Sequence, residues 1–186
     1  MTKIKFLKVR NVKTPSRGTS LSAGIDFYVP NYGADFLADL TDKNINSNCR
    51  FHKHSNPDAP NGVALQIVIP PHCRVLIPSG IKAYMEDQNC ALIAANKSGV
   101  CTKKGLVFGA QVVDADYSGE IHISVINSSD REVTIESGDK LIQFIQTPVV
   151  YSEIEEILGN DKEEQFENLH KGTERGSGGF GSTGTK

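Results

Sequence analysis

Apolar residues recur along this chain with the period of two that is expected of half-buried β-strands. In the stretch GEIHISVIN at 119–127, isoleucine or valine alternates with polar residues, so one face of a strand here would be apolar. Other short runs are rich in β-branched and aromatic residues: KIKFLKV at 3–9, VALQIVI at 63–69, CRVLI at 73–77 and KLIQFIQTPVV at 140–150. Turn-forming residues bound these runs: Pro70-Pro71, Pro78-Ser79-Gly80, Asn127-Ser128-Ser129-Asp130 and Ser137-Gly138-Asp139.

Helical patterning of ten or more residues is nearly absent from the sequence. Short strands that follow one another closely predict an all-β fold of the sandwich, barrel or jelly-roll type. Residues 31–62 interrupt this rhythm with six asparagines and two prolines. We expect this segment to be an insertion on the surface of the β domain, with a short helix near 34–40.

The C-terminal part of the chain has a different composition. Residues 159–174 are polar and acidic, which predicts a flexible connection, and five of the chain's 17 glycines lie in 175–186. Such a segment cannot bury enough surface to fold alone, so it is either a disordered end or an arm that becomes ordered on a ligand. The organisation we predict is a β domain over 1–158, followed by a linker and arm over 159–186.

Charge and hydropathy exclude several classes of protein. Lys and Arg total 20 against 22 for Asp and Glu, a formal net charge of −2, which argues against a nucleic-acid partner. The longest apolar stretches fall far short of the roughly 20 residues of a membrane helix. The N-terminus lacks the apolar centre of a signal peptide. We therefore expect no membrane partner and a cytoplasmic location, in a host cell if the chain is viral.

The four cysteines are scattered, without a CxxC pair, and are expected to be reduced thiols. Cys49, His52 and His54 have a spacing found in metal sites. They offer only three ligands, however, and alternation along a strand explains the same spacing.

Two stretches carry polar groups suited to catalysis or to binding an anion. In VDADYSGE at 113–120, Asp114 and Asp116 lie two apart, so an extended chain directs both carboxylates to one face. There they could bind a cation through water, activate a nucleophile or remain solvated in a turn. In the tail, glycines let backbone N–H groups approach an anion, and Phe180 is suited to lie over a flat base.

Three further stretches are weaker signals. Lys97, Ser98 and Gly99 in 96-NKSGVCTKKG-105 would suit a phosphate, although surface loops often contain such residues. Asp26 lies in AGIDFYVP at 23–30, and Gln143 lies among apolar neighbours in GDKLIQFI at 138–145. A buried glutamine needs hydrogen-bond partners, which a ligand or a second loop would supply.

In this order, the stretches AGIDFY, KSG, VDADYSGE, GDKLIQ and RGSGGFGSTG resemble the five motifs of the trimeric dUTP diphosphatases (dUTPases). The resemblance spans almost the whole chain outside 31–62. It implies a jelly-roll-like, distorted β-barrel with a flexible glycine-rich arm, and a homotrimer with active sites at subunit interfaces. The implied reaction is Mg²⁺-dependent hydrolysis of dUTP to dUMP and pyrophosphate, which limits uracil incorporation into DNA and supplies dUMP for dTMP synthesis.

The resemblance also implies a role for each matching residue. Asp114 is the expected general base, which orients and deprotonates a water for in-line attack at the α-phosphorus. Tyr117 would pack under the sugar and leave no room for a 2′-hydroxyl. Backbone groups of the hairpin from Gly105 to Asp114, Gly109 included, would read the edge of uracil. Asp26 would help to place Mg²⁺ through the water shell of the ion.

The remaining matches concern the phosphates and the base. Lys97, Ser98 and Gly99 match the phosphate-binding second motif, and Gln143 would hold the site near the α-phosphate and the attacking water. In the arm, four residues would clamp the γ-phosphate and one would stack on uracil: Arg175, Gly181, Ser182 and Thr183, and Phe180.

The chain departs from the family pattern at two positions. Lys97 stands where arginine is usual, which keeps the charge but loses the bidentate fork, so we expect phosphate binding to survive with altered geometry. Gln111 stands where many relatives have glycine, and its side chain would either contact the base or face outward.

Two alternative functions stay open at this stage. A dCTP deaminase of the same fold superfamily would need an additional catalytic glutamate, and the glycine-rich arm with its phenylalanine favours the diphosphatase. A regulatory binding module would use residues 31–62 to contact a protein partner. Asp114, Tyr117 and the complete arm argue against lost catalysis, whereas a regulatory partner beside activity is compatible with the sequence.

Overall fold

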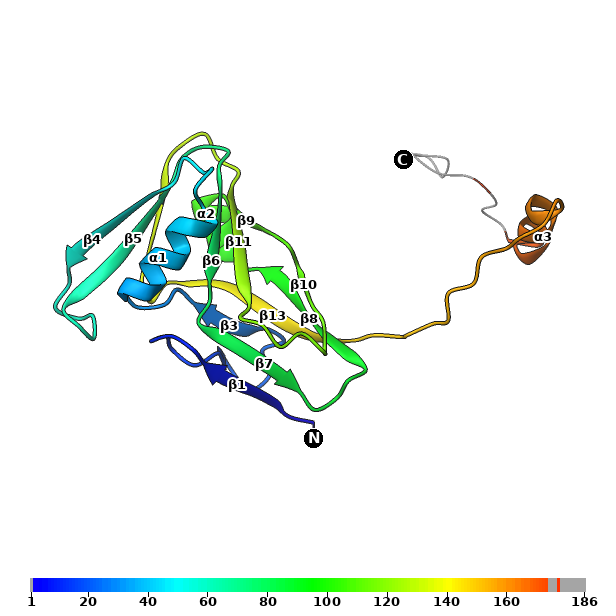
Figure 1. The fold of residues 1–186 in the computed structure, drawn as a ribbon, viewed down its shortest axis with the longest axis horizontal. Coiled ribbons are helices and arrows are strands. Elements are labelled where there is room, and N and C mark those ends of the chain that lie inside the picture. The colour runs from blue at the N-terminus through cyan, green and yellow to red at the C-terminus, as the bar shows by residue number, and fades with distance from the viewer. Residues whose placement is uncertain (1, 174–176, 178–186) are drawn as a thin grey trace. The chain divides into compact units, whose positions relative to one another are not determined.

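Thirteen short strands and three helices make up the part of the chain that the computed structural model describes, residues 2–173 and residue 177 (Figure 1). The all-β prediction is confirmed, since the helices are few and short. The strands are β1 (Ile4–Lys8), β2 (Ser16–Arg17), β3 (Ile25–Tyr28), β4 (Arg50–Ser55), β5 (Val63–Ile69), β6 (Arg74–Pro78), β7 (Ile81–Met85), β8 (Cys90–Asn96), β9 (Leu106–Gly109), β10 (Val112–Val113), β11 (His122–Asn127), β12 (Val133–Glu136) and β13 (Lys140–Pro148). The helices are α1 (Ala34–Lys43), α2 (Ser98–Lys104) and α3 (Lys162–Leu169).

The strands form four antiparallel sheets. Their hydrogen-bonded orders are β10-β8-β13-β3-β2, β6-β11-β9, β12-β5-β4 and β1-β7. In β11 the alternation predicted from the sequence is confirmed, because Ile123 and Val125 are buried while His122 and Ser124 are half-buried. One continuous apolar core draws residues from every sheet. Its largest fully buried side chains include Phe27, Leu65, Ile77 and Phe144.

Residues 31–62, the predicted surface insertion, form α1 and β4 with their connections. The short helix predicted near 34–40 is confirmed, and α1 lies against β6 (Figure 1). Phe36 and Leu40 lie one turn apart and are fully buried, so this segment also contributes to the core. β4 pairs along its whole length with β5.

The chain consists of two compact units, and the first ends at Val150. Within the second unit, α3 (Lys162–Leu169) forms in the stretch whose polar composition predicts a flexible connection, so the sequence missed this helix. The flexible connection itself stays a prediction. Glu163 and Glu164 lie in the first turn of α3, where negative charge interacts favourably with the helix dipole. The domain boundary at 158 stays a prediction.

Strand alternation accounts for the spacing of Cys49, His52 and His54. Cys49 precedes β4, and both histidines lie on this strand. In the part of the chain that the structure describes, one group of three side chains could hold a metal ion, and it consists of Asp39, Glu120 and His122. None of the described helices combines the length and the apolar character that crossing a bilayer requires.

Candidate active site

Asp26, on β3 of the five-stranded sheet, accepts hydrogen bonds from two lysines. The carboxylate is 6% exposed, and it accepts Lys97 Nζ–H at 2.5 Å and Lys140 Nζ–H at 2.9 Å, one on each oxygen. Burial raises the pKa of Asp26, but the hydrogen bonds from both lysines outweigh burial and bring the pKa below its ordinary value. The hydrogen bond between Lys140 and Asp26 also raises the pKa of Lys140. Asp26 thus fixes two ammonium groups beside the second motif.

Gln143 lies next to Asp26 because β13 pairs with β3 at this point. The side-chain amide of Gln143 donates to the Asn96 carbonyl at 3.1 Å, which directs it toward the start of α2. Gly24 makes this placement possible, since a Cβ at Gly24 would lie 2.7 Å from the Gln143 Cβ and 2.1 Å from its Oε1. The structure therefore brings together the first, second and fourth stretches identified in the sequence.

The second stretch forms the beginning of α2. Lys97 is the extended N-cap residue, and Ser98 and Gly99 open the helix. The first N–H groups of a helix have no intrahelical acceptor. The Cβ position of Gly99 faces open space, so the backbone here is accessible to a ligand.

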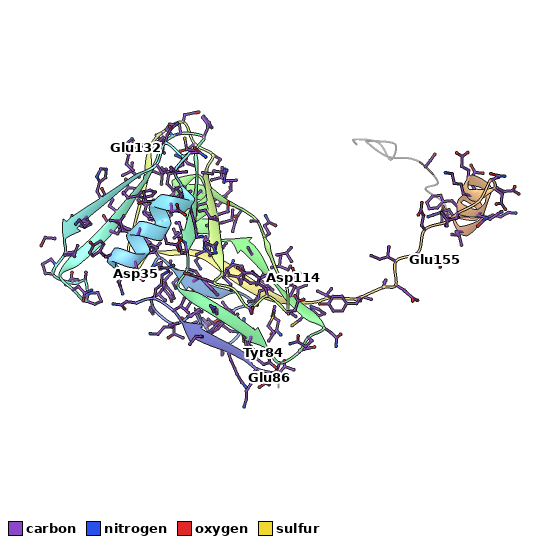
Figure 2. All side chains as sticks on the ribbon, viewed as in Figure 1. Asp35, Tyr84, Glu86, Asp114, Glu132 and Glu155 are labelled. Carbon is purple, nitrogen blue, oxygen red and sulfur yellow. The ribbon has the colours of Figure 1, made fainter. Side chains whose placement is uncertain are left out.

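The third stretch follows β10 as an exposed turn. Asp114 is exposed, and its carbonyl accepts the Tyr117 N–H at 3.2 Å (Figure 2). The Tyr117 hydroxyl donates to the Glu120 carbonyl at 2.9 Å, and a Cβ at Gly119 would lie 2.4 Å from that hydroxyl. Tyr117 is 44% exposed and, with Ala115, lines a groove of about 300 Å³ against β1 and β7.

The segment from Gly105 to Asp114 is a crossing between sheets, which corrects the expected hairpin. β9 pairs with β11, and β10 pairs with β8, but β9 and β10 do not pair with each other. Gly109 lies opposite Ser124 at the end of β9. Ala110 turns the chain at φ 49°, and Gln111 donates its amide to the Phe108 carbonyl at 3.2 Å. The Gln111 side chain thus folds back on the turn.

Asp114 and Asp26 lie in different parts of the sheet. The residue before Asp114 is level with Gln146 of β13, whereas Asp26 is level with Gln143, and β8 and β13 lie between β10 and β3. With about 3.3 Å per residue and about 4.8 Å between strands, the two Cα atoms lie about 20 Å apart. The expected base and the expected phosphate groups of one chain therefore do not meet.

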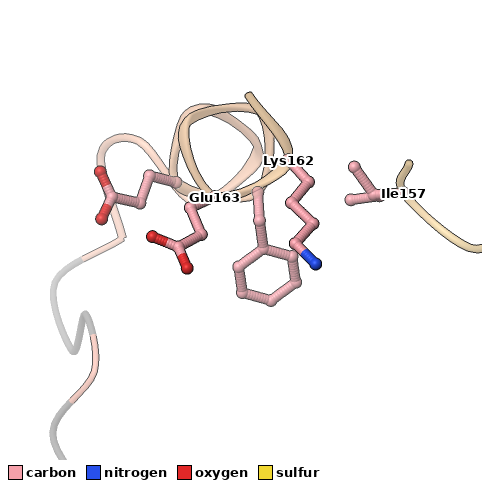
Figure 3. Close-up of a pocket in the computed structure, with 5 residues that line it drawn as sticks. Ile157, Lys162 and Glu163 are labelled. Atoms are coloured by element: carbon pink, nitrogen blue, oxygen red, sulfur yellow. The ribbon is translucent and has the colours of Figure 1, made fainter. Parts of the chain in front are cut away.

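The predicted arm residues lie outside the described residues: Arg175, Phe180, Gly181, Ser182 and Thr183. A hollow of about 380 Å³ between Ile157 and α3 contains none of the predicted site residues (Figure 3).

Sequence reasoning missed three residues that support these groups. Lys140 shares Asp26 with Lys97, and its position within the GDKLIQ stretch was the available signal. Glu120 closes the Tyr117 turn, and it too lies in a stretch already singled out. Its partner Arg10 had no signal in the sequence, because the two are 110 residues apart.

Three comparisons with known proteins identify the family and the fold of this chain. The dUTPase family model matches residues 62–184. The deoxyuridine 5′-triphosphate nucleotidohydrolase of Acinetobacter baylyi is 39% identical over 122 residues, which cover 64% of this chain and 75% of that protein. The protein of the same name from Pseudomonas fluorescens is also 39% identical, over 64% of this chain and 74% of its own.

Solved structures share the fold at low sequence identity. The dUTPase of Staphylococcus bacteriophage 80alpha, with dUPNHPP, has a TM-score of 0.67 at 17% identity and covers 98% of both chains. The native EIAV dUTPase has a TM-score of 0.56 at 18% identity and covers 85% of this chain and 98% of its own. The family model matches most of the chain, and we conclude that this protein belongs to the dUTPase family.

Proposed function

We propose that the chain hydrolyses dUTP to dUMP and pyrophosphate, with each active site built from more than one copy of the chain. The observation that carries this proposal is the family match together with the placement of its motifs in two separate groups. Asp26, Lys97 and Gln143 form one half of a site, and Asp114 and Tyr117 form the other. A homotrimer would bring the first half of one copy to the second half of its neighbour.

The half with Lys97 takes the triphosphate. The Lys97 and Lys140 ammonium groups carry positive charge, and Ser98 and Gly99 add helix-start N–H groups, which suit phosphate oxygens. Gln143 contributes a neutral amide beside the α-phosphate. In this assignment the arm residues named above close over the γ-phosphate and the base of the bound nucleotide.

The half with Asp114 supplies the nucleophile. Asp114 accepts a proton from a water that attacks the α-phosphorus, and the bond from that phosphorus to the bridging oxygen breaks as pyrophosphate leaves. A carboxylate is a weak base, so much of its effect comes from holding the water in line. Tyr117 lies under the sugar, and backbone groups around Gly109 read uracil.

Magnesium enters as part of the substrate, Mg–dUTP. Asp26 does not fit the role of a metal-placing residue in this structure, because both of its oxygens accept lysine N–H groups and its side chain is 6% exposed. We therefore assign Asp26 the task of holding the two lysines and derive no step through the metal. A cytoplasmic location, with the nucleotide pool, stays a prediction.

A pyrophosphate-release assay over dUTP, dCTP, dTTP and UTP, with and without Mg²⁺, tests this function. Of the four nucleotides, we expect only dUTP to release pyrophosphate. This release should be faster with Mg²⁺ than without it. Ammonia release from dCTP would instead identify a deaminase. Absence of both products from all four nucleotides would leave a binding module and contradict the proposal.

A further inference from the structure

Arg10 connects α1 to the loop that carries Tyr117. The guanidinium is 12% exposed, and it donates from Nε and a terminal nitrogen to the two carboxylate oxygens of Glu120, at 2.8 and 2.9 Å. It also donates to Asp39 at 2.5 Å and to Asp35, which is labelled on α1 in Figure 2, at 3.3 Å. The bidentate geometry fixes both the distance and the plane of the Glu120 carboxylate.

Glu120 in turn holds Tyr117. Its backbone carbonyl accepts the Tyr117 hydroxyl at 2.9 Å and lies 2.8 Å from His122 Nδ1. Its carboxylate also accepts the Gly80 N–H at 2.6 Å. Without Arg10, this largely buried carboxylate would face Asp39 with the Gly80 N–H as its remaining donor. Since an uncompensated buried charge is costly, Glu120 would turn toward solvent and shift its carbonyl.

The other end of this connection is firmly anchored. Phe36 and Leu40 bury one face of α1, and the side chain of Asn44 bonds both the N–H and the carbonyl of Leu76 at 2.8 Å. Asp39 therefore presents its carboxylate to Arg10 from a fixed helix. This helix precedes residues 62–184, the part that the family model matches.

We propose that Arg10 is a positioning residue for sugar selection. It links α1 to Glu120, and Glu120 holds the ring of Tyr117 in place. The inference rests on the proposed function, in which Tyr117 lies under the deoxyribose. A ring held by its hydroxyl at a fixed carbonyl keeps the space for a 2′-hydroxyl closed. A ring released from that carbonyl tilts and admits ribose. Residues 31–62 thus support substrate choice through α1.

The test compares kcat/KM for dUTP with kcat/KM for UTP in each variant. Both rates come from the same sample, so the fraction of folded protein cancels in the ratio. We expect Arg10→Gln to lower the preference for dUTP by about tenfold or more, the scale of a small misplacement in an active site. Arg10→Lys keeps the positive charge but lacks the two-pronged guanidinium, so it should lower the preference for dUTP less than Arg10→Gln does. Asp39→Ala should also have this smaller effect.

Arg50→Gln is the matched control, because Arg50 pairs with Glu132 on an exposed edge far along the chain from Tyr117. Its ratio should equal that of the unmodified protein. An unchanged ratio in Arg10→Gln, beside a lowered ratio in Tyr117→Ala, would overturn the inference and leave the proposed function standing. If Arg10→Gln does not fold, an unchanged ratio in Arg10→Lys and Asp39→Ala has the same meaning. No dUTP hydrolysis by the unmodified protein would reject the proposed function and the inference with it. An unchanged ratio in Tyr117→Ala would show that sugar selection lies elsewhere, which would overturn the inference and leave dUTP hydrolysis standing.

Discussion

A single carboxylate organises the positive charge of the phosphate half-site. Asp26 is bonded to Lys97 and Lys140, which come from the end of β8 and the start of β13. One negative and two positive side chains leave a net positive charge beside Ser98 and Gln143. Lys97 is a point charge on a flexible stem, and Asp26 supplies the orientation that an arginine fork would otherwise provide.

The lowered pKa of Asp26 predicts a pH-dependent contribution to stability. Above about pH 4, the ordinary pKa of an aspartate, the folded and unfolded chains both carry the carboxylate, and its stabilisation is fully present. The contribution is lost as pH falls further, through the lower pKa of the folded chain. Asp26→Asn should therefore reduce the free energy of unfolding by about 1.5–3 kcal/mol at pH 7, the range for hydrogen bonds to a charged group.

Urea unfolding of both proteins in steps from pH 7 to pH 3 measures this difference. The gap between wild type and Asp26→Asn should narrow below about pH 4. Asp58→Asn, at an exposed loop position, is the control and should show no gap. A gap that stayed constant across the acid range would show that the lysine bonds do not hold the pKa down.

Asp114→Asn should abolish pyrophosphate release while nucleotide binding persists. The amide keeps the shape of the side chain but cannot accept the proton of the attacking water, a loss of about 100-fold to 10,000-fold. Turnover of dUTP and calorimetric binding of a non-hydrolysable analogue measure the two effects separately. Asp116→Asn, in the same exposed turn, should retain most activity. Equal losses in both variants would count against Asp114 as the base.

At the scale of elements, the approach of β3 to β13 depends on a glycine. Gly24 precedes β3, and the side chain of Gln143 fills the space that a Cβ at Gly24 would need. The connection between β9 and β10 has a different feature. There the chain leaves one sheet for another, with Ala110 at positive φ. Both features place backbone or amide groups at the ends of strands, where a ligand can reach them.

Gly24→Ala should lower dUTP turnover by about 10-fold to 100-fold, because the new methyl group displaces the Gln143 amide from the α-phosphate. The Gln143 Cβ belongs to a paired strand and cannot move away alone. Gly18→Ala is the matched control, since its new Cβ would meet its nearest atom at an ordinary 3.5 Å. Steady-state kinetics of the two variants decide the point. Unchanged turnover in Gly24→Ala would show that the position of the Gln143 amide does not matter for the reaction.

At the scale of the whole molecule, one chain holds two halves that belong to different sites. The five-stranded sheet separates Asp114 from Asp26 by about 20 Å, farther than their side chains reach. A neighbouring copy is therefore part of the chemistry that we propose. A substitution in either half should therefore inactivate a protein made only of the substituted chain.

Mixing two inactive variants should restore activity. When Asp114→Asn and Gln143→Ala chains exchange subunits, a site with a wild-type residue from each copy arises in about a quarter of random pairings. Pyrophosphate release before and after mixing measures the recovery, and each variant mixed with itself is the control. Absence of recovery after proven exchange would place both residues of a site on one chain.

Local pattern accounts for most of the elements that the sequence predicted. The alternation around Ile123 and the turn residues at its ends act over a few positions, so β11 could be read directly. The helix near Phe36 was visible in the same way. In contrast, α3 forms in an acidic stretch whose composition resembles that of a flexible connection, and no apolar periodicity predicts this helix.

The motifs determined the family and the type of each site residue, because the chemistry of a carboxylate, a lysine or a glycine is carried by its own atoms. The fold decided which of these groups meet. Asp26 faces two lysines, and Arg10 joins Asp39 to Glu120 over separations of 29 and 110 residues. Contacts of that range depend on strand order and register, which arise only when the sheets assemble, so the support of Tyr117 by α1 became visible only in three dimensions.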